Sequence, residues 1–240
     1  MSQIKKAVIL AAGRGTRMRE LTDELPKPMI PVHGKPILEH IVSGLAANGV
    51  TDFLIVVGYR KDVVMDHFGD GAERGLSINY VEQIVQDGTG KVVELGREFT
   101  GADPFVLSYG DILVSPESYG PLVDFTEVDA KLTVKSNEDV RKGGAVFIDE
   151  HGSVTDLIEK PEEGQPTSSS YNAGIYAFSS EIYDFTARLK LSPRGEYELT
   201  DAIADLVRAG KKVKAVELTG DWADVRDPEV LAELNAPKES

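Results

Sequence analysis

Short apolar runs alternate with amphipathic segments through the first half of the chain. Four runs have the length and composition of buried strands: residues 7–10, 53–57, 78–81 and 105–108. Three segments between them have helical spacing of apolar residues: the stretch after Pro36 that stops at Gly49, residues 62–68 and residues 91–99. This alternation predicts an α/β fold with a mainly parallel central sheet and helices on both faces, of Rossmann-like type.

The pattern changes after residue 109 and becomes rich in β-strand signals. Strands are predicted at residues 131–135, 145–148, 154–159, 170–178 and 213–217, and helices at 181–189 and 198–209. The polar stretch 165–170 reads as a loop between strands. No linker interrupts the chain, so we expect residues 1–240 to form one domain with an additional β-rich part.

Charge and composition narrow the possible partners. The chain has 26 Lys and Arg against 40 Asp and Glu, a formal net charge of −14, which disfavours binding to nucleic acid or to an anionic membrane surface. An anionic substrate must therefore meet a local cationic pocket. Cysteine is absent, which excludes disulfides and thiolate catalysis. No apolar stretch reaches membrane-spanning length, so a soluble, cytoplasmic protein is expected.

A glycine turn follows the first predicted strand directly. Gly13 and Gly15 allow backbone N–H groups to approach a phosphate closely. The spacing fits neither a P-loop nor a dinucleotide fingerprint. Taken alone, two glycines favour an ordinary strand-to-helix turn. Their pairing with Arg14, Arg17 and Lys27 in an acidic protein favours a nucleoside triphosphate site.

Six motifs, in the same order along the chain, resemble those of the sugar-1-phosphate nucleotidyltransferases. They are residues 10–18, residues 26–29, Gln83 with residues 88–90, residues 109–111, residues 159–161 with 172–174, and residues 222–225. Segment 194–201 is most similar to the glucose-1-phosphate thymidylyltransferase and uridylyltransferase branch. Some members of that branch continue into a left-handed β-helix acyltransferase domain, which is not expected here because the chain ends at Ser240. Arg226-Asp227 stands where the family usually has Gly-Thr, a departure that concerns the local turn and the choice of sugar.

The resemblance implies a reaction and its catalytic residues. A sugar 1-phosphate attacks the α-phosphorus of a nucleoside triphosphate in line and releases pyrophosphate, with dTTP or UTP and glucose 1-phosphate favoured as substrates. Asp111 and Asp224 are the expected ligands of Mg²⁺. Arg17 is assigned to the β- and γ-phosphates, and Lys27 to the space between the α-phosphate and the sugar phosphate. Lys27 by itself could equally be a surface lysine between two prolines.

The remaining assignments also follow from the resemblance. The expected nucleotide-binding residues are Leu10, Ala11, Ala12, Gly13, Arg14, Gly15, Thr16, Gln83, Gly88 and Thr89. The expected sugar-phosphate site consists of Gly144, Glu159, Lys160 and Asn172, although Glu159-Lys160 alone would read as an exposed charge pair. Gln83 offers an amide to the imide edge of a pyrimidine. Trp222 is expected to pack near the second aspartate.

Other readings remain open at this point. Within the family, a mannose-1-phosphate guanylyltransferase is the main alternative. Outside it, a glycosyltransferase that consumes a nucleotide sugar uses a similar sheet and metal aspartates, but it does not need three cations around a triphosphate. A non-catalytic sensor of nucleotide sugars would be expected to have lost Asp111, Asp224, Arg17 or Lys27. The resemblance is also compatible with a homo-oligomer.

Overall fold

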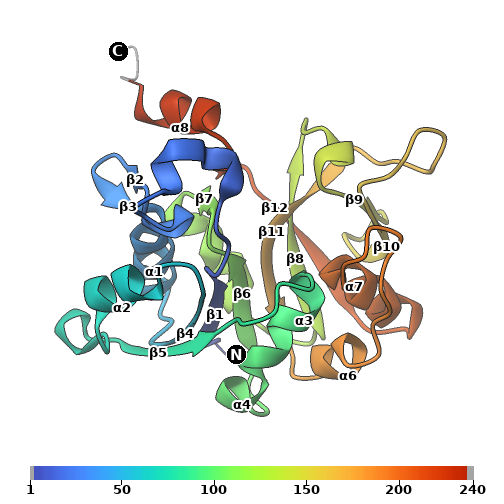
Figure 1. Cartoon of the computed structure of the whole chain (residues 1–240). Coiled ribbons are helices and arrows are strands. Elements are labelled where there is room, and N and C mark those ends of the chain that lie inside the picture. Colours follow the sequence, from blue (N-terminus) through green and yellow to red (C-terminus); the bar gives the residue numbers. More distant parts are fainter. Residues whose placement is uncertain (1–2, 237–240) are drawn as a thin grey trace.

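The computed structural model describes residues 3–236, and its centre is a parallel sheet (Figure 1). Four strands lie in the order β5 (Ser77–Glu82), β4 (Asp52–Val57), β1 (Lys6–Leu10) and β6 (Phe105–Tyr109), and all three neighbouring pairs are parallel. The carboxyl ends of these strands meet at one edge of the sheet. The predicted α/β architecture is confirmed.

Helices cover both faces because alternate residues of each buried strand face opposite cores. In β1, Ala7 and Ile9 belong to one core, whereas Val8 belongs to the other. The first core also contains residues of α1 (Ile37–Ala47), α2 (Lys61–Phe68) and α5 (Gly120–Val123). The second contains residues of α3 (Thr89–Val93), α6 (Ile182–Thr186) and α7 (Leu199–Arg208). Strands buried on both sides are what the near-continuous apolar runs predicted.

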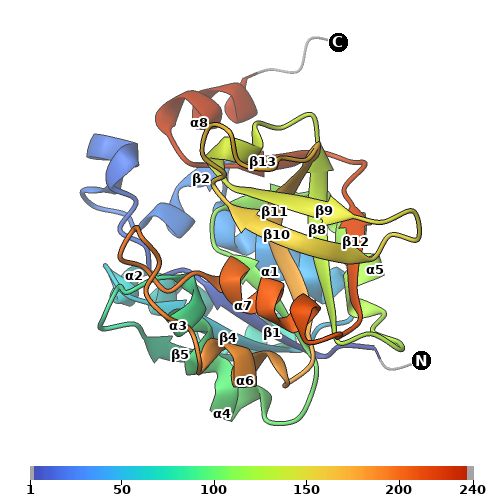
Figure 2. The same ribbon diagram turned by 90° about the vertical axis from the view of Figure 1, so that its right-hand side faces the viewer.

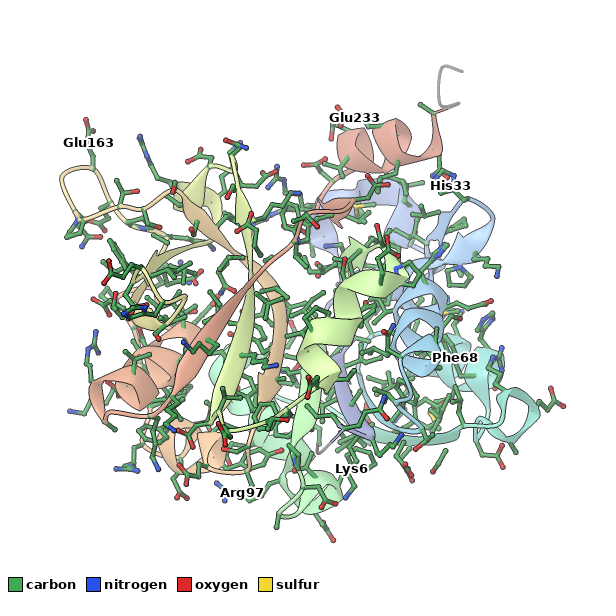
Figure 3. The ribbon with its side chains drawn as sticks, turned by 180° about the vertical axis from the view of Figure 1, so that it is seen from behind. Lys6, His33, Phe68, Arg97, Glu163 and Glu233 are labelled. Atoms are coloured by element: carbon green, nitrogen blue, oxygen red, sulfur yellow. The ribbon has the colours of Figure 1, made fainter. Side chains whose placement is uncertain are left out.

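The β-rich part is joined to the parallel sheet through β11 (Ser170–Phe178), as Figure 2 shows. This strand is antiparallel to β6, to β8 (Ala130–Ser136) and to β9 (Gly144–Ile148). β10 (Val154–Glu159) pairs with β9, and β12 (Val213–Glu217) runs parallel to β8. The loop between β10 and β11 projects from the molecule with Glu163 on it (Figure 3).

Several short elements were not predicted. The strands among them are β2 (Pro31–Val32), β3 (Lys35–Pro36), β7 (Ile112–Val114) and β13 (Trp222–Asp224). The 3-10 segments are Thr16–Thr22, Lys27–Met29, Ala72–Arg74, Pro116–Tyr119 and Val140–Lys142. Helix α8 (Pro228–Asn235) was also missed, although Asp227 caps it by accepting a hydrogen bond from the Val230 amide at 3.0 Å.

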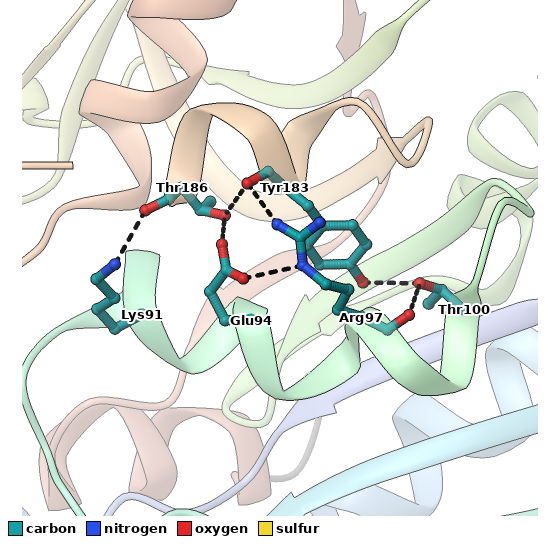
Figure 4. A network of polar contacts seen from close by, with 6 residues as sticks. All are labelled: Lys91, Glu94, Arg97, Thr100, Tyr183 and Thr186. Carbon is teal, nitrogen blue, oxygen red and sulfur yellow. Dashed lines mark hydrogen bonds and ion pairs between the residues drawn. The ribbon is translucent and has the colours of Figure 1, made fainter. Parts of the chain in front are cut away.

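The prediction of one continuous helix over residues 91–99 is wrong. The segment consists of α3, a 3-10 turn (Glu94–Gly96) and α4 (Arg97–Thr100). At Gly96 a Cβ atom would lie 3.1 Å from Val8 and from the Tyr183 hydroxyl, so the turn packs tightly against the sheet and α6. Arg97 then donates to the Tyr183 carbonyl at 2.7 Å, within the network of Figure 4. Tertiary contacts override the local helical pattern here.

Helix α6 is also shorter than predicted, because it ends at Thr186 instead of residue 189. Within residues 3–236, no helix combines the length and the apolar character needed to cross a membrane.

Candidate active site

A first cavity of about 390 Å³ opens at the carboxyl edge of the parallel sheet. Its walls come from the loop after β1, the loop between β5 and α3, and the end of β6. Seven residues of the predicted nucleotide-binding set line it: Leu10, Ala11, Ala12, Gly13, Gln83, Gly88 and Thr89. The Gly110 amide donates to the Leu10 carbonyl at 2.9 Å, which holds the ends of β1 and β6 together at its floor.

A second cavity of about 230 Å³ lies between the end of β6 and the β-rich part. All four residues of the predicted sugar-phosphate site line it: Gly144, Glu159, Lys160 and Asn172. Arg17, Asp111 and Asp224 line it too. Thr89, Tyr109, Asp111 and Glu196 border both cavities, so the two spaces adjoin at Asp111.

The two acidic residues come together through the short strands β7 and β13. In this antiparallel pair Asp224 lies opposite Ile112, and the Val225 amide donates to the Asp111 carbonyl at 2.9 Å. Burial, and secondly the negative charge of Asp111, raise the pKa of Asp224 to about 6. The positive charges of Lys27, Arg226 and Arg17 oppose this shift.

This carboxylate pair suits a hard divalent cation. Two adjacent acidic side chains repel each other unless a positive charge stands between or beside them. Among the described residues no group of three or more His, Asp or Glu is placed to hold a metal. Mg²⁺ is one such cation, and it is commonly held by one or two carboxylates together with phosphate oxygens of the substrate.

Lys27 lines the first cavity, next to Asp111, where the two cavities adjoin. Its ammonium group forms an ion pair with Asp111, and its side chain is largely buried. The aliphatic stem packs on Gly15, where a Cβ atom would lie 2.6 Å from the Cβ of Lys27 and where φ is +69°. Glycine is therefore required at position 15 for packing as well as for backbone conformation.

Three residues of the predicted nucleotide-binding set line neither cavity: Arg14, Gly15 and Thr16. Arg14 is exposed, and its guanidinium lies over the ring of Tyr59, 5.0 Å from the ring centre. Arg17 lines the second cavity and not the first.

The sugar-side residues approach one another closely. At Gly144 a Cβ atom would lie 3.1 Å from the Cβ of Asn172 and 3.6 Å from a carboxylate oxygen of Glu159. Asn172 donates to the Tyr176 hydroxyl at 2.8 Å. Burial raises the pKa of Glu159, and the nearby Arg194 guanidinium acts in the opposite direction. A larger residue at position 144 would fill the space beside both polar groups.

Arg194 and Glu198 also line the second cavity and had been given no role. Arg194 forms an ion pair with Glu198 at 2.6 Å and a longer one with Glu159 at 3.6 Å. Both belong to the segment quoted above for its resemblance. Helical i,i+4 spacing gives no signal for this pair, because Arg194 lies in a turn and Glu198 precedes the first residue of α7.

Trp222 lies where it was expected. Its indole nitrogen donates to the Ala173 carbonyl at 3.0 Å, and its ring meets Tyr171 edge to face at 5.5 Å. It is half-buried beside the strand residue Asp224.

The site lies beyond the carboxyl ends of the parallel strands, which is where α/β proteins with an open sheet bind their ligands. Residues 6–240 match the family described as Nucleotidyl transferase, and the chain belongs to that family.

Similar proteins support this placement. The chain is 38% identical over 229 residues to a bifunctional protein GlmU of Methanocaldococcus jannaschii, covering 95% of this chain and 53% of that protein. It thus spans about half the length of that relative. It is 34% identical to a UTP–glucose-1-phosphate uridylyltransferase AglF of Haloferax volcanii, covering 93% of this chain and 92% of that protein.

A solved structure shares the fold along nearly the whole chain. It is a putative glucose-1-phosphate thymidylyltransferase from Bacillus anthracis in complex with a sucrose, with a TM-score of 0.86 and 31% identity. The alignment covers 96% of this chain and 93% of that one. The predicted fold class and family are therefore confirmed.

Proposed function

We propose that this chain joins a nucleoside triphosphate to a sugar 1-phosphate and releases pyrophosphate. The observation that carries the proposal is the meeting of two cavities at Asp111, with Lys27 and Asp224 beside it. A reaction between two polyanions needs their mutual repulsion neutralised where they touch. The relatives named above as nucleotidyltransferases for glucose 1-phosphate support the same reaction.

The triphosphate occupies the first cavity in this proposal, and the sugar phosphate the second. Lys27 neutralises charge at the junction, and Arg17 and Lys160 add positive charge on the sugar side. Asp111 and Asp224 would hold Mg²⁺, which supplies further charge neutralisation at the phosphates. Alignment of the reactants then contributes more than proton transfer does.

In this proposal the base is selected by the amide of Gln83, and the sugar by the side chains of Glu159 and Asn172. Gln83 borders the first cavity and donates from its amide nitrogen to the Val85 carbonyl at 3.0 Å, which leaves its oxygen available to a base N–H. Such an acceptor suits the N–H of uracil or thymine, and we favour these bases because the relatives named above are a uridylyltransferase and a putative thymidylyltransferase. Glu159 and Asn172 face the second cavity, where glucose hydroxyls would pair with them. A sugar that lacks such a hydroxyl leaves a buried polar group unpaired and should be rejected.

The proposal is tested by pyrophosphate release over a grid of nucleoside triphosphates and sugar 1-phosphates, with and without Mg²⁺. We expect the highest rates with dTTP or UTP and glucose 1-phosphate, and none after chelation of divalent cations. Activity confined to GTP and mannose 1-phosphate would contradict the substrate choice but not the reaction. Absence of release with every pair would contradict the reaction itself.

Alanine substitutions at Gly13 and Gly88 should affect different properties: triphosphate binding in the first case and stability of the fold in the second. A Cβ atom at Gly88 would lie 2.5 Å from backbone atoms of Tyr197, and φ there is +116°, so Gly88→Ala should lower the free energy of unfolding by about 2 kcal/mol. At Gly13 no atom lies within 4 Å of the same position, so Gly13→Ala should leave stability unchanged. It should instead raise KM for the triphosphate, because the methyl group enters the first cavity. Urea denaturation and steady-state kinetics measure the two effects.

A further inference from the structure

Tyr59 lies in a strained turn that is pressed against the glycine loop. The turn follows β4, and at Gly58 a Cβ atom would lie 2.7 Å from the Ala12 carbonyl. Arg60, on the other side of Tyr59, has a left-handed backbone with φ +51°. Since such a conformation is rarely adopted by a non-glycine residue, the position of Tyr59 is set by the tertiary structure.

The side chain of Tyr59 contacts both ends of one segment. Its hydroxyl donates to the Asp23 carbonyl at 2.9 Å, and its ring lies under the Arg14 guanidinium. Arg14 and Asp23 flank the 3-10 segment Thr16–Thr22, which carries Arg17 toward the second cavity. One half-buried tyrosine therefore ties together the start and the end of the loop that borders both proposed substrate spaces.

Other contacts hold the middle of the segment. Met18 is fully buried in the core, and the Thr22 hydroxyl donates to the Gly15 carbonyl at 3.3 Å. Arg14 and Asp23 themselves are exposed, as are the neighbouring side chains of Leu21 and Leu25. The exposed ends of such a segment move away from the protein easily, even when a residue in its middle is buried, unless a further contact restrains them.

We infer that Tyr59 is a positioning residue for both substrates, because it orders residues 13–25 before they bind, and these residues include Gly13 at the first cavity and Arg17 at the second. The inference rests on the proposed function. Without Tyr59 the bound nucleotide would have to order the loop itself, and its apparent affinity would fall by the fraction of molecules in which the loop is open. Arg17 lies in the same loop and lines the second cavity, so the sugar phosphate should lose apparent affinity too.

Two substitutions divide the role of the side chain. Tyr59→Phe removes only the hydroxyl and should raise KM for the triphosphate about fivefold. Tyr59→Leu also removes the contact with Arg14 and should raise it about twentyfold. KM for the sugar 1-phosphate should rise as well in both variants, since Arg17 lies in the same loop and lines the second cavity.

Tyr80→Phe is the matched control. Tyr80 also donates its hydroxyl to a backbone carbonyl, that of Gly69 at 2.6 Å, but it borders neither cavity. Both kinetic constants should stay at wild-type values. An unchanged KM for the triphosphate after Tyr59→Leu would overturn the inference, because Gly13 and Arg17 would then keep their positions without Tyr59.

Hydrogen exchange without any ligand gives an independent readout. Amides of residues 13–25 should exchange faster in Tyr59→Leu than in wild type, while those of β1 should not change. Unchanged exchange in residues 13–25 overturns the inference whatever the kinetics show. A wild-type protein that releases no pyrophosphate would overturn the proposed function instead, and exchange would then decide the loop-anchoring role by itself.

Discussion

Replacing Lys27 with alanine is expected to lower the rate of pyrophosphate release by a factor of about 100 to 1000. Lys27 lines the first cavity, and its ammonium group pairs with Asp111, which borders both cavities. Removing it takes positive charge from the point where the two anionic substrates must approach each other. The loss should appear mainly in kcat, because the charge matters most where negative charge builds up in the transition state.

Lys35→Ala provides a control for the loss of one lysine. Its side chain is 62% exposed and only approaches Glu39, at 3.9 Å, so we expect wild-type activity. Circular dichroism should show both variants folded. If Lys27→Ala kept a third of the wild-type rate, Lys27 would have no central role in the reaction.

The central sheet was predictable because its strands are buried on both faces. Runs such as residues 53–57 are apolar at nearly every position, and few other local structures need that pattern. The paired strands β7 and β13 were not predictable in the same way. Each has three residues, too few to show a period of two, and their pairing joins segments that are far apart in sequence.

For the same reason, the residues of the candidate site could be predicted from the sequence, but their arrangement in space could not. Sequence motifs give residue types in order along the chain, and Asp111 and Asp224 could be singled out in that way. Their adjacency depends on the register of β7 against β13, which only the fold supplies. Arg14 shows the opposite case. Its position next to Gly13 in the sequence predicted that it binds the nucleotide, but its guanidinium lies over the ring of Tyr59.

Asp224→Asn is expected to stabilise the protein in the absence of divalent cations while it abolishes activity. Folding raises the pKa of Asp224 from 3.8 to about 6, so the folded state favours the neutral acid. This group therefore lowers the free energy of unfolding as pH rises from about 4 to above 6, by roughly 3 kcal/mol in total. An amide carries no charge at any of these pH values, so the variant should avoid most of that loss in the free energy of unfolding.

Thermal unfolding at two pH values tests this expectation. At about pH 8 without Mg²⁺, the variant should melt roughly 5 °C above wild type, since about 1 kcal/mol shifts Tm by 2–4 °C in a chain of this size. Near pH 4 the two proteins should melt together, because Asp224 is then neutral in the folded wild type. Pyrophosphate release should fall at least about 100-fold, as for loss of one metal ligand.

Mg²⁺ should narrow the difference in stability, because it binds the folded wild type and relieves the repulsion between Asp111 and Asp224. Asp62→Asn, at a side chain that is 63% exposed, should change neither Tm nor activity and so controls for the loss of one negative charge. A variant that melts below wild type at pH 8 would show that Asp224 stabilises the fold as a carboxylate. In that case repulsion between Asp111 and Asp224 could no longer be the reason that the site needs a cation.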